Sequence, residues 1–432
     1  MSRVLVVGAY GMIGAALTRH LIAEGHHVTG LGRSVRTARQ TFPELKWVFH
    51  DLAHMTIPGD WLPYLRDIDV VVNAAGALQD GPSDDLTAVH GVAISTLAEA
   101  CAAHVTGLIQ ISAAGVSPDA TSHFFRSKAA GDNAIQSAGC DYWILRPGLV
   151  LSQTAYGGTA LLRMLAAVPL IQPLALAETP VQTIGMDDLA RAVSACIRGD
   201  LPAGTIADLV EDTPHSLAEL IADIRRWLGF NPARATVCAP GWVMTLTARA
   251  ADALGWLGWR SPLRSTAVQT LSDGVLGDPG PWKALGGPPI RALQDTLAAA
   301  PARGEDRLSA RMRLAMPFVI ATLALFWALS GLIGMIRLDA SAGLLTAEGW
   351  PLWAAQLSVA GWAVVDIGLA AALLWRGTAQ RAALGMVAVS FAYLVLGTFI
   401  TPALWADPLG PLLKILPGMM LAALAVPLLD MR

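Results

Sequence analysis

Charged residues are scarce in this 432-residue sequence: they make up 15% of it, whereas hydrophobic residues make up 54%. Soluble globular proteins usually contain about a quarter charged residues. Part of the chain is therefore expected to face lipid or to be unusually buried. The formal net charge of −3 gives no basic footprint for nucleic acid, so we expect no nucleic-acid partner.

Cysteine is also rare, and no cysteine forms a C-x-x-C pair or lies near histidines with metal-ligand spacing. The four are Cys101, Cys140, Cys196 and Cys238. We interpret them as small buried thiols in a reducing compartment, and we expect no metal site. A secretory leader is not apparent, because Gly8 interrupts the apolar run Val4–Val7. The first domain is therefore expected to stay in the cytoplasm.

Four long apolar runs occupy the last third of the sequence. They are Ala315–Ile336, Pro351–Trp375, Ala382–Ile400 and Ile415–Leu429, the last of which Leu409–Leu413 extends. A membrane-spanning helix needs roughly 20 apolar residues, and the only charge within the four runs is Asp366. Residues 313–432 are thus predicted to form a four-helix transmembrane domain. A large buried helical core is the alternative, and such long charge-free runs disfavour it.

The basic residues predict the orientation of these helices. Arginines precede the first run, flank the loop after the second and end the chain: Arg303, Arg307, Arg311, Arg313, Arg376, Arg381 and Arg432. Because basic residues favour the cytoplasmic side, both termini are predicted to be cytoplasmic in a multi-pass protein of the cell inner membrane. Tryptophans near the predicted helix ends suit the membrane interface: Trp350, Trp353, Trp375 and Trp405.

Residues 1–235 show a different pattern, in which strand-like runs alternate with helical ones. The expected strands are Val4–Val7, Val28–Leu31, Trp47–Phe49, Val70–Asn73, Leu108–Ser112 and Trp143–Leu145, with helices such as Met12–Glu24 and Leu86–His104 between them. This alternation predicts an α/β domain with a doubly wound parallel sheet of Rossmann type. Residues 236–312 are predicted as a helical connecting segment. Its helix Trp242–Leu257 lies on the membrane surface or packs on the sheet, and the sequence leaves both open.

A glycine-rich turn follows the first expected strand. Gly8, Gly11 and Gly14 stand in a G-x-x-G-x-x-G pattern that opens a helix. Such a turn lets backbone amides approach a pyrophosphate at the helix N-terminus. We therefore predict a dinucleotide site. Its candidate residues in the turn are Gly8, Tyr10, Gly11, Met12, Ile13 and Gly14.

The next strand ends at Arg33 and lacks the acid that NAD-binding domains place on the ribose. A guanidinium suits a 2′-phosphate, so NADP(H) is predicted in preference to NAD(H). Asp51 and Leu52 follow the third strand, where they would meet the adenine. Residues Asn73, Ala74, Ala75 and Gly76 follow the fourth, where small residues let backbone approach the cofactor.

Across residues 1–230 these features resemble the short-chain dehydrogenase/reductase superfamily, in its atypical extended branch. That branch includes NmrA-like proteins and the nucleotide-binding accessory subunit of respiratory complex I. Besides the glycines, the resemblance rests on Asp51-Leu52, Asn73–Gly76, Ile111–Gly115, Ser127-Lys128, Arg146–Gly148 and Asp187–Ala190. The last span region resembles a DoxX-like four-helix membrane domain, chiefly in its hydropathy and its fusion to this type of Rossmann domain.

The resemblance implies a catalytic set of Ser, Tyr and Lys, and one member is missing here. Ser112 and Lys128 are present, and Lys128 would also hold the cofactor ribose. Phe124 stands at the Tyr position and cannot transfer a proton. Three interpretations follow: His123 or a water supplies the proton, the acceptor is a quinone or flavin-like ring that needs less help, or the cofactor is bound without turnover.

Other polar residues are candidates with competing roles. Arg146 ends a strand at the sheet edge where ligands bind, and it is either a substrate residue or an internal ion-pair partner. Asp187-Asp188 precede an expected helix (Leu189–Ile197), so capping explains them. Asp366 lies inside a span, where ionisable residues usually face a partner or a cavity. It serves a quinone or proton site, or it hydrogen-bonds to Ser358, Thr398 or Thr401.

Two functions are compatible with these features. The first is a membrane-bound NADPH oxidoreductase that acts on a lipophilic small molecule, such as a quinone or an isoprenoid lipid. The second is an NADP(H)-binding scaffold or redox sensor whose membrane domain joins a partner protein. Transport by the four spans is disfavoured because few polar residues line them.

Overall fold

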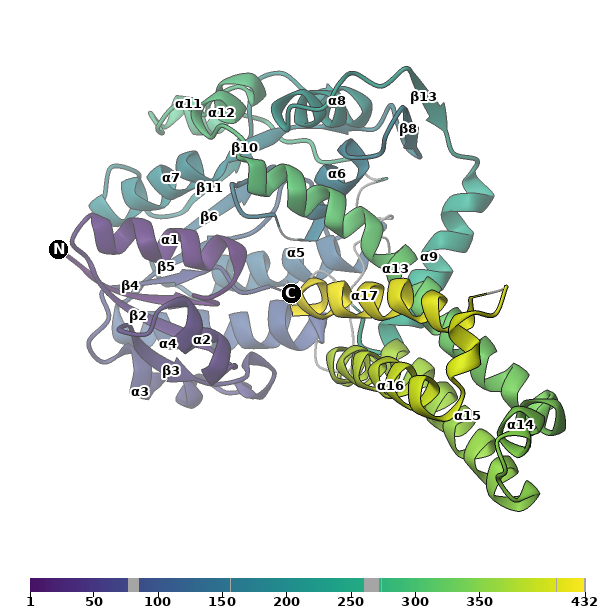
Figure 1. The fold of residues 1–432 in the computed structure, drawn as a ribbon. Helices are drawn as coiled ribbons and strands as arrows, with labels where there is room; N and C mark the ends of the chain where they lie inside the picture. Colours follow the sequence, from purple (N-terminus) through teal and green to yellow (C-terminus); the bar gives the residue numbers. More distant parts are fainter. Residues whose placement is uncertain (77–84, 156, 260–271, 273, 409, 431–432) are drawn as a thin grey trace. The chain divides into compact units, whose positions relative to one another are not determined.

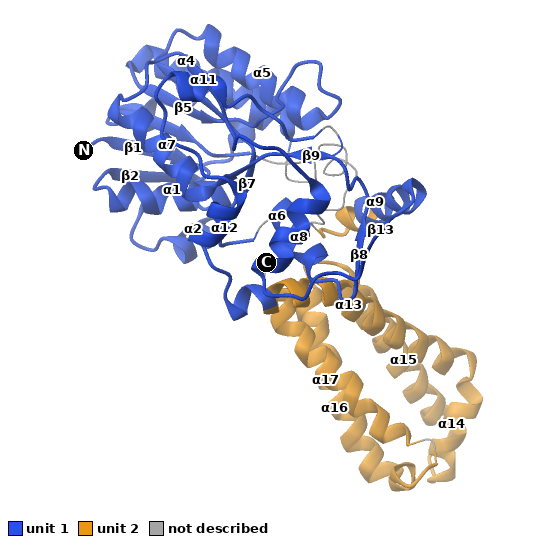
Figure 2. Ribbon diagram, turned by 90° about the horizontal axis from the view of Figure 1, so that it is seen from above, with its two compact units in different colours: residues 1–252, 261–307 blue, residues 253–260, 308–432 orange. Residues whose placement is uncertain are grey.

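A computed structural model of the chain describes residues 1–76, 85–155, 157–259, 272, 274–408 and 410–430. The chain forms two compact units (Figure 2). Unit 1 comprises residues 1–252 and 261–307, and unit 2 comprises residues 253–260 and 308–432. Each unit is described by itself below.

Unit 1 is built on a seven-stranded parallel sheet with the order β11-β6-β5-β4-β1-β2-β3 (Figure 1). Its strands are β1 (Arg3–Val7), β2 (His27–Gly32), β3 (Lys46–Phe49), β4 (Val70–Asn73), β5 (Gly107–Ile111), β6 (Tyr142–Pro147) and β11 (Thr205–Leu209). The six predicted strands and the doubly wound α/β class are confirmed. Residues Val4 to Val7 are completely buried, as an unbroken apolar run in a two-sided parallel sheet should be.

Helices cover both faces of this sheet, which creates two separate hydrophobic cores. On one face α1 (Met12–Ala23) and α7 (Met186–Arg198) pack against the strands. On the other face α3 (Leu62–Leu65), α4 (Ala93–His104) and α5 (His123–Ser137) do so. The strand order reverses beside β1, so its carboxyl end is the place where ligands bind in such folds.

Shorter elements complete unit 1. They are α2 (Val35–Thr41), η1 (Leu52–His54), η2 (Pro58–Asp60), the π-helical turn η3 (Ala88–Val92), β7 (Leu149–Leu151), α6 (Gly157–Ala166), β8 (Ile171–Leu174), β9 (Pro180–Val181), β10 (Thr183–Gly185), β12 (His215–Ser216), α8 (Leu217–Trp227), β13 (Ala235–Cys238), α9 (Gly241–Trp256), α11 (Gly280–Ala284) and α12 (Leu293–Ala299). Strands β7–β10 pair outside the main sheet. Their two to four residues are too short to show a sequence period.

The part of the connecting segment that holds α11 and α12 packs on the sheet unit. Trp282 is buried in the core beneath α7, and the guanidinium of Arg291 contacts Asp188 at 2.8 Å. The predicted capping role of Asp187-Asp188 is therefore wrong. The N-cap of α7 is Gly185, with no side-chain cap, and Asp188 turns inward to pair with Arg291 and Arg191.

Unit 2 is helical. It contains α13 (Gly304–Ile336), which begins in unit 1, followed by α14 (Leu338–Ala347), α15 (Leu352–Leu374), α16 (Ala379–Ile400), η4 (Pro402–Trp405) and α17 (Pro411–Asp430). Among the described residues, the four long helices α13, α15, α16 and α17 are apolar enough to cross a membrane. Only 17–22% of each most apolar window is buried inside the protein, so the remaining apolar side chains require lipid contact. A self-contained helical core is thereby disfavoured.

The cysteines differ from one another in exposure. Cys101 and Cys196 are buried, as expected, whereas Cys140 is half-buried and Cys238 is exposed. The expectation of four buried thiols is wrong for Cys238 because β13 lies outside the main sheet, where both of its faces are open.

Candidate functional site

The glycine turn between β1 and α1 has no space for side chains. A Cβ on Gly14 would lie 2.2 Å from the carbonyl oxygen of Gly8, and one on Gly8 would lie 2.8 Å from the Cα of Ala75. Gly8 also has a φ of +77°, which side chains with a Cβ rarely adopt. The turn thus brings α1 against β1 and brings the loop after β4 against both.

The first turn of α1 offers free amide donors. Gly11, the N-cap, donates to the Gly8 carbonyl oxygen over 2.9 Å. The amides of Met12, Ile13 and Gly14 donate to none of the residues that the structure describes. Three outward amides at the positive end of a helix dipole form an anion site. The turn fits the pyrophosphate of a dinucleotide.

Tyr10 organises the end of β2. Its hydroxyl oxygen accepts the amides of Arg33 and Ser34, each over 3.1 Å, and its ring covers the space where a Cβ on Gly32 would stand, 2.3 Å away. The backbone of Arg33 is thereby held at the end of β2, and its guanidinium lies 3.8 Å from the carboxylate of Asp51. Arg33 and Asp51, both predicted cofactor residues, are therefore neighbours.

The loop after β4 is fixed by a buried amide. Asn73 donates from Nδ2 to Gln110 Oε1 over 2.7 Å, and its Oδ1 accepts the amide of Ala75 over 3.2 Å. The amide of Ala74 donates to the carbonyl oxygen of Val7. This bonding holds the backbone of Ala74 to Gly76 at the carboxyl end of β1, beside the glycine turn.

Lys128 and Phe124 lie one turn apart on α5 and face each other. The Lys128 ammonium is 5.7 Å from the centre of the Phe124 ring, so the two residues predicted to stand side by side in the site are in contact. Lys128 is buried and donates to the carbonyl oxygen of Ile111 over 3.0 Å. Burial lowers the pKa of Lys128 to about 8, although nearby Asp132 opposes the shift.

His90 is a buried residue that the sequence did not single out. Its ring meets the edge of Phe124, and its Nδ1 lies 2.9 Å from the hydroxyl of Ser127. That hydroxyl also lies 2.9 Å from the carbonyl oxygen of Phe124. When it donates its single proton to this oxygen, Nδ1 is the protonated nitrogen of His90 and Nε2 is the acceptor. Burial, with a smaller effect of Lys128, lowers the pKa of His90 to about 2.

The acceptor of His90 and the ammonium of Lys128 converge on Gly76. A Cβ built there would lie 3.2 Å from His90 Nε2 and 3.9 Å from Lys128 Nζ. Three elements, η3, α5 and the loop after β4, therefore bring a hydrogen-bond acceptor and a cation to one point.

His123, by contrast, is the first residue of α5, and its Nε2 is 3.5 Å from the Thr87 hydroxyl.

Ser112 and Arg146 meet at a second residue missed from the sequence, Asp132. The Ser112 hydroxyl donates to Asp132 Oδ2 over 2.9 Å, and Arg146 Nε donates to the same oxygen over 3.1 Å. Burial raises the pKa of the Asp132 carboxyl, whereas Arg146 and the Ser112 hydroxyl lower it. Of the two roles predicted for Arg146, the structure shows the internal ion pair, which it forms with Asp132. Ser112 is nearly buried and bonded to this carboxylate.

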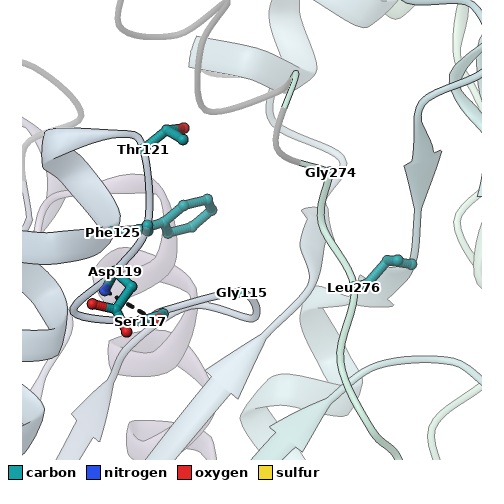
Figure 3. Close-up of a pocket in the computed structure, with 8 residues that line it drawn as sticks. Gly115, Ser117, Asp119, Thr121, Phe125, Gly274 and Leu276 are labelled. Carbon is teal, nitrogen blue, oxygen red and sulfur yellow. Dashed lines mark hydrogen bonds between the residues drawn. The ribbon is translucent and has the colours of Figure 1, made fainter.

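A cavity of about 340 Å³ opens beside the start of α5. Figure 3 shows Thr121 and Phe125 on one side of it and the segment with Gly274 and Leu276 on the other. Its wall also includes the loop after β5, with Gly115 and Ser117. The cavity therefore lies at the carboxyl edge of the sheet. One of its lining residues, Phe125, directly follows Phe124 in the sequence.

Asp366 is buried among three helices of unit 2. Its carboxylate accepts hydroxyl protons from Ser330 of α13 over 3.0 Å and from Tyr393 of α16 over 3.1 Å. The predicted partners Ser358, Thr398 and Thr401 are wrong. Ser358 is eight residues away, about 12 Å along the same helix. Thr398 and Thr401 bond to carbonyl oxygens of their own helix.

The chain matches two family models. Residues 8–169 match a family described as NAD(P)H-binding, and residues 324–423 match the DoxX-like family. The chain joins an NAD(P)H-binding domain to a DoxX-like domain. Both domains predicted by resemblance are thus confirmed, and the second places the four apolar helices in a membrane environment.

The fold of the NAD(P)H-binding domain is shared with solved structures of low sequence identity. The enzyme WbmH of Bordetella bronchiseptica, in complex with NAD+, is 19% identical, with a TM-score of 0.51 over 69% of this chain and 97% of that one. The triphenylmethane reductase of a Citrobacter species, complexed with NADP(H), is 16% identical, with a TM-score of 0.52 over 69% of this chain and 99% of that one. No curated protein matches the chain.

The residues missed from the sequence share a reason. His90, Asp132 and Gln110 all belong to regular elements, and each is buried, so none of them stands out as a loop residue at the edge of the sheet. Asp132 follows Lys128 by four residues, a spacing that puts both on one helix face, so it was the one that the sequence could have indicated. His90 acquires its neighbours only when η3 packs on α5.

Proposed function

We propose that this protein is a membrane-anchored NAD(P)H oxidoreductase that reduces a lipophilic acceptor, a quinone or an isoprenoid lipid. The observation that carries the proposal is the convergence of Lys128 and His90 on Gly76, beside the amide cradle of the glycine turn. A buried hydrogen-bond acceptor and a buried ammonium group next to an anion site suit the hydroxyl groups of a nicotinamide ribose. The membrane helices supply the reason for an acceptor that partitions into lipid.

The cofactor would be held by residues from four loops. The amides of Met12 to Gly14 suit the pyrophosphate, Asp51 and Leu52 border the adenosine end, and the loop Ala74–Gly76 approaches the nicotinamide half. Lys128 donates to a ribose hydroxyl, and His90 Nε2 accepts from one. The cofactor, when bound, supplies two electrons to the acceptor.

The missing Tyr favours a quinone over an ordinary carbonyl. Reduction of a carbonyl needs a protein acid in the transition state, and such groups contribute typically 10²–10⁴-fold. Phe124 cannot serve, and His90, with its pKa of about 2, is neutral at pH 7 and therefore cannot act as a general acid. A quinone takes a hydride from NADPH and one proton from water to form the quinol, so it needs no side chain at position 124.

Arg33 is the basis for preferring NADP(H). Its guanidinium lies 3.8 Å from the carboxylate of Asp51, at the edge of the predicted cofactor site, and a guanidinium can bind a 2′-phosphate through two parallel hydrogen bonds. We expect Arg33→Ala to weaken NADPH affinity about tenfold or more and to leave NADH affinity within about twofold. Equal losses for both cofactors, measured by quenching of tryptophan fluorescence, would remove the argument for NADP(H).

The decisive experiment uses the full-length protein in detergent or nanodiscs. NADPH and NADH affinities are measured first, and oxidation of bound NADPH is then followed at 340 nm after a short-chain quinone is added. Tight binding with turnover supports the oxidoreductase. Lys128→Met, a near-isosteric change, should reduce both binding and turnover, whereas replacement of the exposed Lys283 in the same way should change neither.

A second candidate, favoured by Phe124, is an NADP(H)-binding scaffold or redox sensor with a membrane partner protein. In that case NADPH binds without turnover and raises the melting temperature. Phe124→Tyr separates the two, because the new hydroxyl would lie near the Lys128 ammonium and restore carbonyl reduction in an otherwise competent site. No activity in this variant with any quinone or carbonyl would favour the scaffold.

The localisation belongs to the same proposal. We place the protein in the cell inner membrane with both termini cytoplasmic, which the arginines before α13 and after α15 support. Reagents that cannot cross the membrane should label a cysteine introduced at Ala347, before α15, from the periplasm of intact cells. Labelling of that site only after lysis would reverse the orientation.

A further inference from the structure

Helix α9 exposes its largest apolar side chains. Trp242 is 70% exposed, Leu246 is 62% exposed, Leu254 is 42% exposed and Trp256 is 81% exposed. The residues of this helix that are buried are Ala248, Ala251 and Gly255. A surface helix of a globular domain does the opposite: it buries its large apolar residues and exposes polar ones. This helix packs on the protein through its smallest residues.

The exposed apolar side chains form one stripe. At 100° per residue, Trp242, Leu246, Ala250, Ala253 and Leu254 fall within one sector of roughly 120°, opposite the three buried small residues. Trp256, the last residue of the helix, lies about 40° beyond the edge of this sector that Arg249 borders. Polar side chains lie outside that sector. Thr245, Arg249 and Asp252 flank it on one edge, with Arg249 nearest to the apolar stripe.

The end of α9 is bonded to the end of a predicted membrane span. The amide of Arg376 donates to the carbonyl oxygen of Leu257 over 2.9 Å, and Trp259 Nε1 donates to the carbonyl oxygen of Leu374 over 2.6 Å. Leu374 is the last residue of α15. The Arg376 guanidinium also lies over the Trp259 ring, 5.6 Å from its centre. The helix therefore ends at the level where hydrocarbon meets headgroups.

We propose that α9 lies in the bilayer interface, with its apolar stripe in contact with lipid. Continuity with the end of α15 identifies the occupant, because a helix that leaves this level with a stripe of Trp and Leu has the acyl boundary as its nearest apolar environment. Arg249, at the edge of the stripe, suits lipid phosphate. This inference concerns α9 alone and does not depend on the cofactor chemistry.

The test compares two neighbouring positions on α9. Cys140 and Cys238 are first replaced by Ser, and Leu246→Cys and Thr245→Cys are then made separately and labelled with an environment-sensitive fluorophore. Both positions are exposed, but they point about 100° apart. The full-length protein is placed in nanodiscs of neutral and anionic lipid, with and without lipids brominated in the acyl chain, after its melting temperature is shown to be unchanged.

We expect brominated lipid to quench the label at position 246 at least threefold more than the label at position 245. Equal, weak quenching at both positions would overturn the proposal. So would protection of position 246 that appears only when two copies share one nanodisc, because the occupant would then be a second chain. A quenching pattern repeated over positions 242–254 with the helical period would support lipid contact along the whole stripe.

Discussion

The residues around Phe124 illustrate how a buried polar cluster forms from separate elements. His90, Ser127 and Lys128 come from η3 and α5, and each has a hydrogen-bond partner. Burial keeps His90 neutral and lowers the pKa of Lys128. The cluster therefore contains an acceptor that does not titrate in the physiological range beside a cation that does.

His90 should make stability depend on acid pH. Its pKa is near 6.5 in the unfolded chain and about 2 when folded. Between these values only the unfolded state binds the proton, so the contribution is fully present above pH 6.5 and is lost as pH falls. The loss is about 1.4 kcal/mol per pH unit. In His90→Asn, the fall in melting temperature from pH 7 to pH 5 should be smaller than in the parent.

The control for this prediction is His104→Asn, at an exposed histidine of α4, which should keep the parental slope. An unchanged slope in His90→Asn would mean that His90 is protonated in the folded protein, and its role as an acceptor beside Gly76 would then be wrong.

At the scale of elements, the β1–α1 turn tolerates the least change. A Cβ at Gly14 meets backbone 2.2 Å away, and backbone cannot move aside as a side chain can. Gly14→Ala should therefore lower NADPH affinity by about 100-fold or prevent folding, and thermal unfolding distinguishes the two. Gly158→Ala, in α6, has open space at its Cβ and should bind NADPH like the parent. Normal affinity in Gly14→Ala would exclude the turn as the pyrophosphate site.

The link between α7 and the segment before α12 is a second prediction at this scale. Asp188 is buried, with 1% of its side chain exposed, and pairs with Arg291. Removing one partner of a buried pair typically costs about 3–5 kcal/mol. Asp188→Ala should lower the melting temperature by several degrees and accelerate proteolysis near residue 288. Asp187→Ala, at a side chain that is 77% exposed, should leave both unchanged, and equal effects would contradict the assignment.

For the whole molecule, the contact among α13, α15 and α16 depends on Asp366. Hydrogen bonds between membrane helices contribute about 0.6 kcal/mol on average and at most about 1.7. Ser330→Ala should therefore lower the stability of unit 2 modestly, while Ser358→Ala, on the same helix as Asp366, should not. A thermal shift assay in detergent compares them. If Ser330→Ala and Ser358→Ala are equally stable, the hydrogen bond between Ser330 and Asp366 does not stabilise the helix packing.

Asp366→Asn adds a functional measurement to the same site. The amide keeps an acceptor and can satisfy both hydroxyls, so stability should be retained within about 1 kcal/mol. If Asp366 serves only to pack helices, quinone reduction remains at the parental rate. A loss of turnover without a loss of stability would assign it to proton or quinone handling.

The sequence alone determined the parallel sheet, the glycine turn and the four apolar helices, because each depends on local periodicity or on one residue type at fixed spacing. It also determined that Phe124 stands one turn before Lys128. The tertiary structure decided which polar groups meet: His90 with Ser127, Asp132 with Ser112 and Arg146, and Asp366 with Ser330 and Tyr393. Hydrogen-bond partners far apart in sequence leave no periodic signal, since only the packing of whole elements brings them within hydrogen-bonding distance of each other.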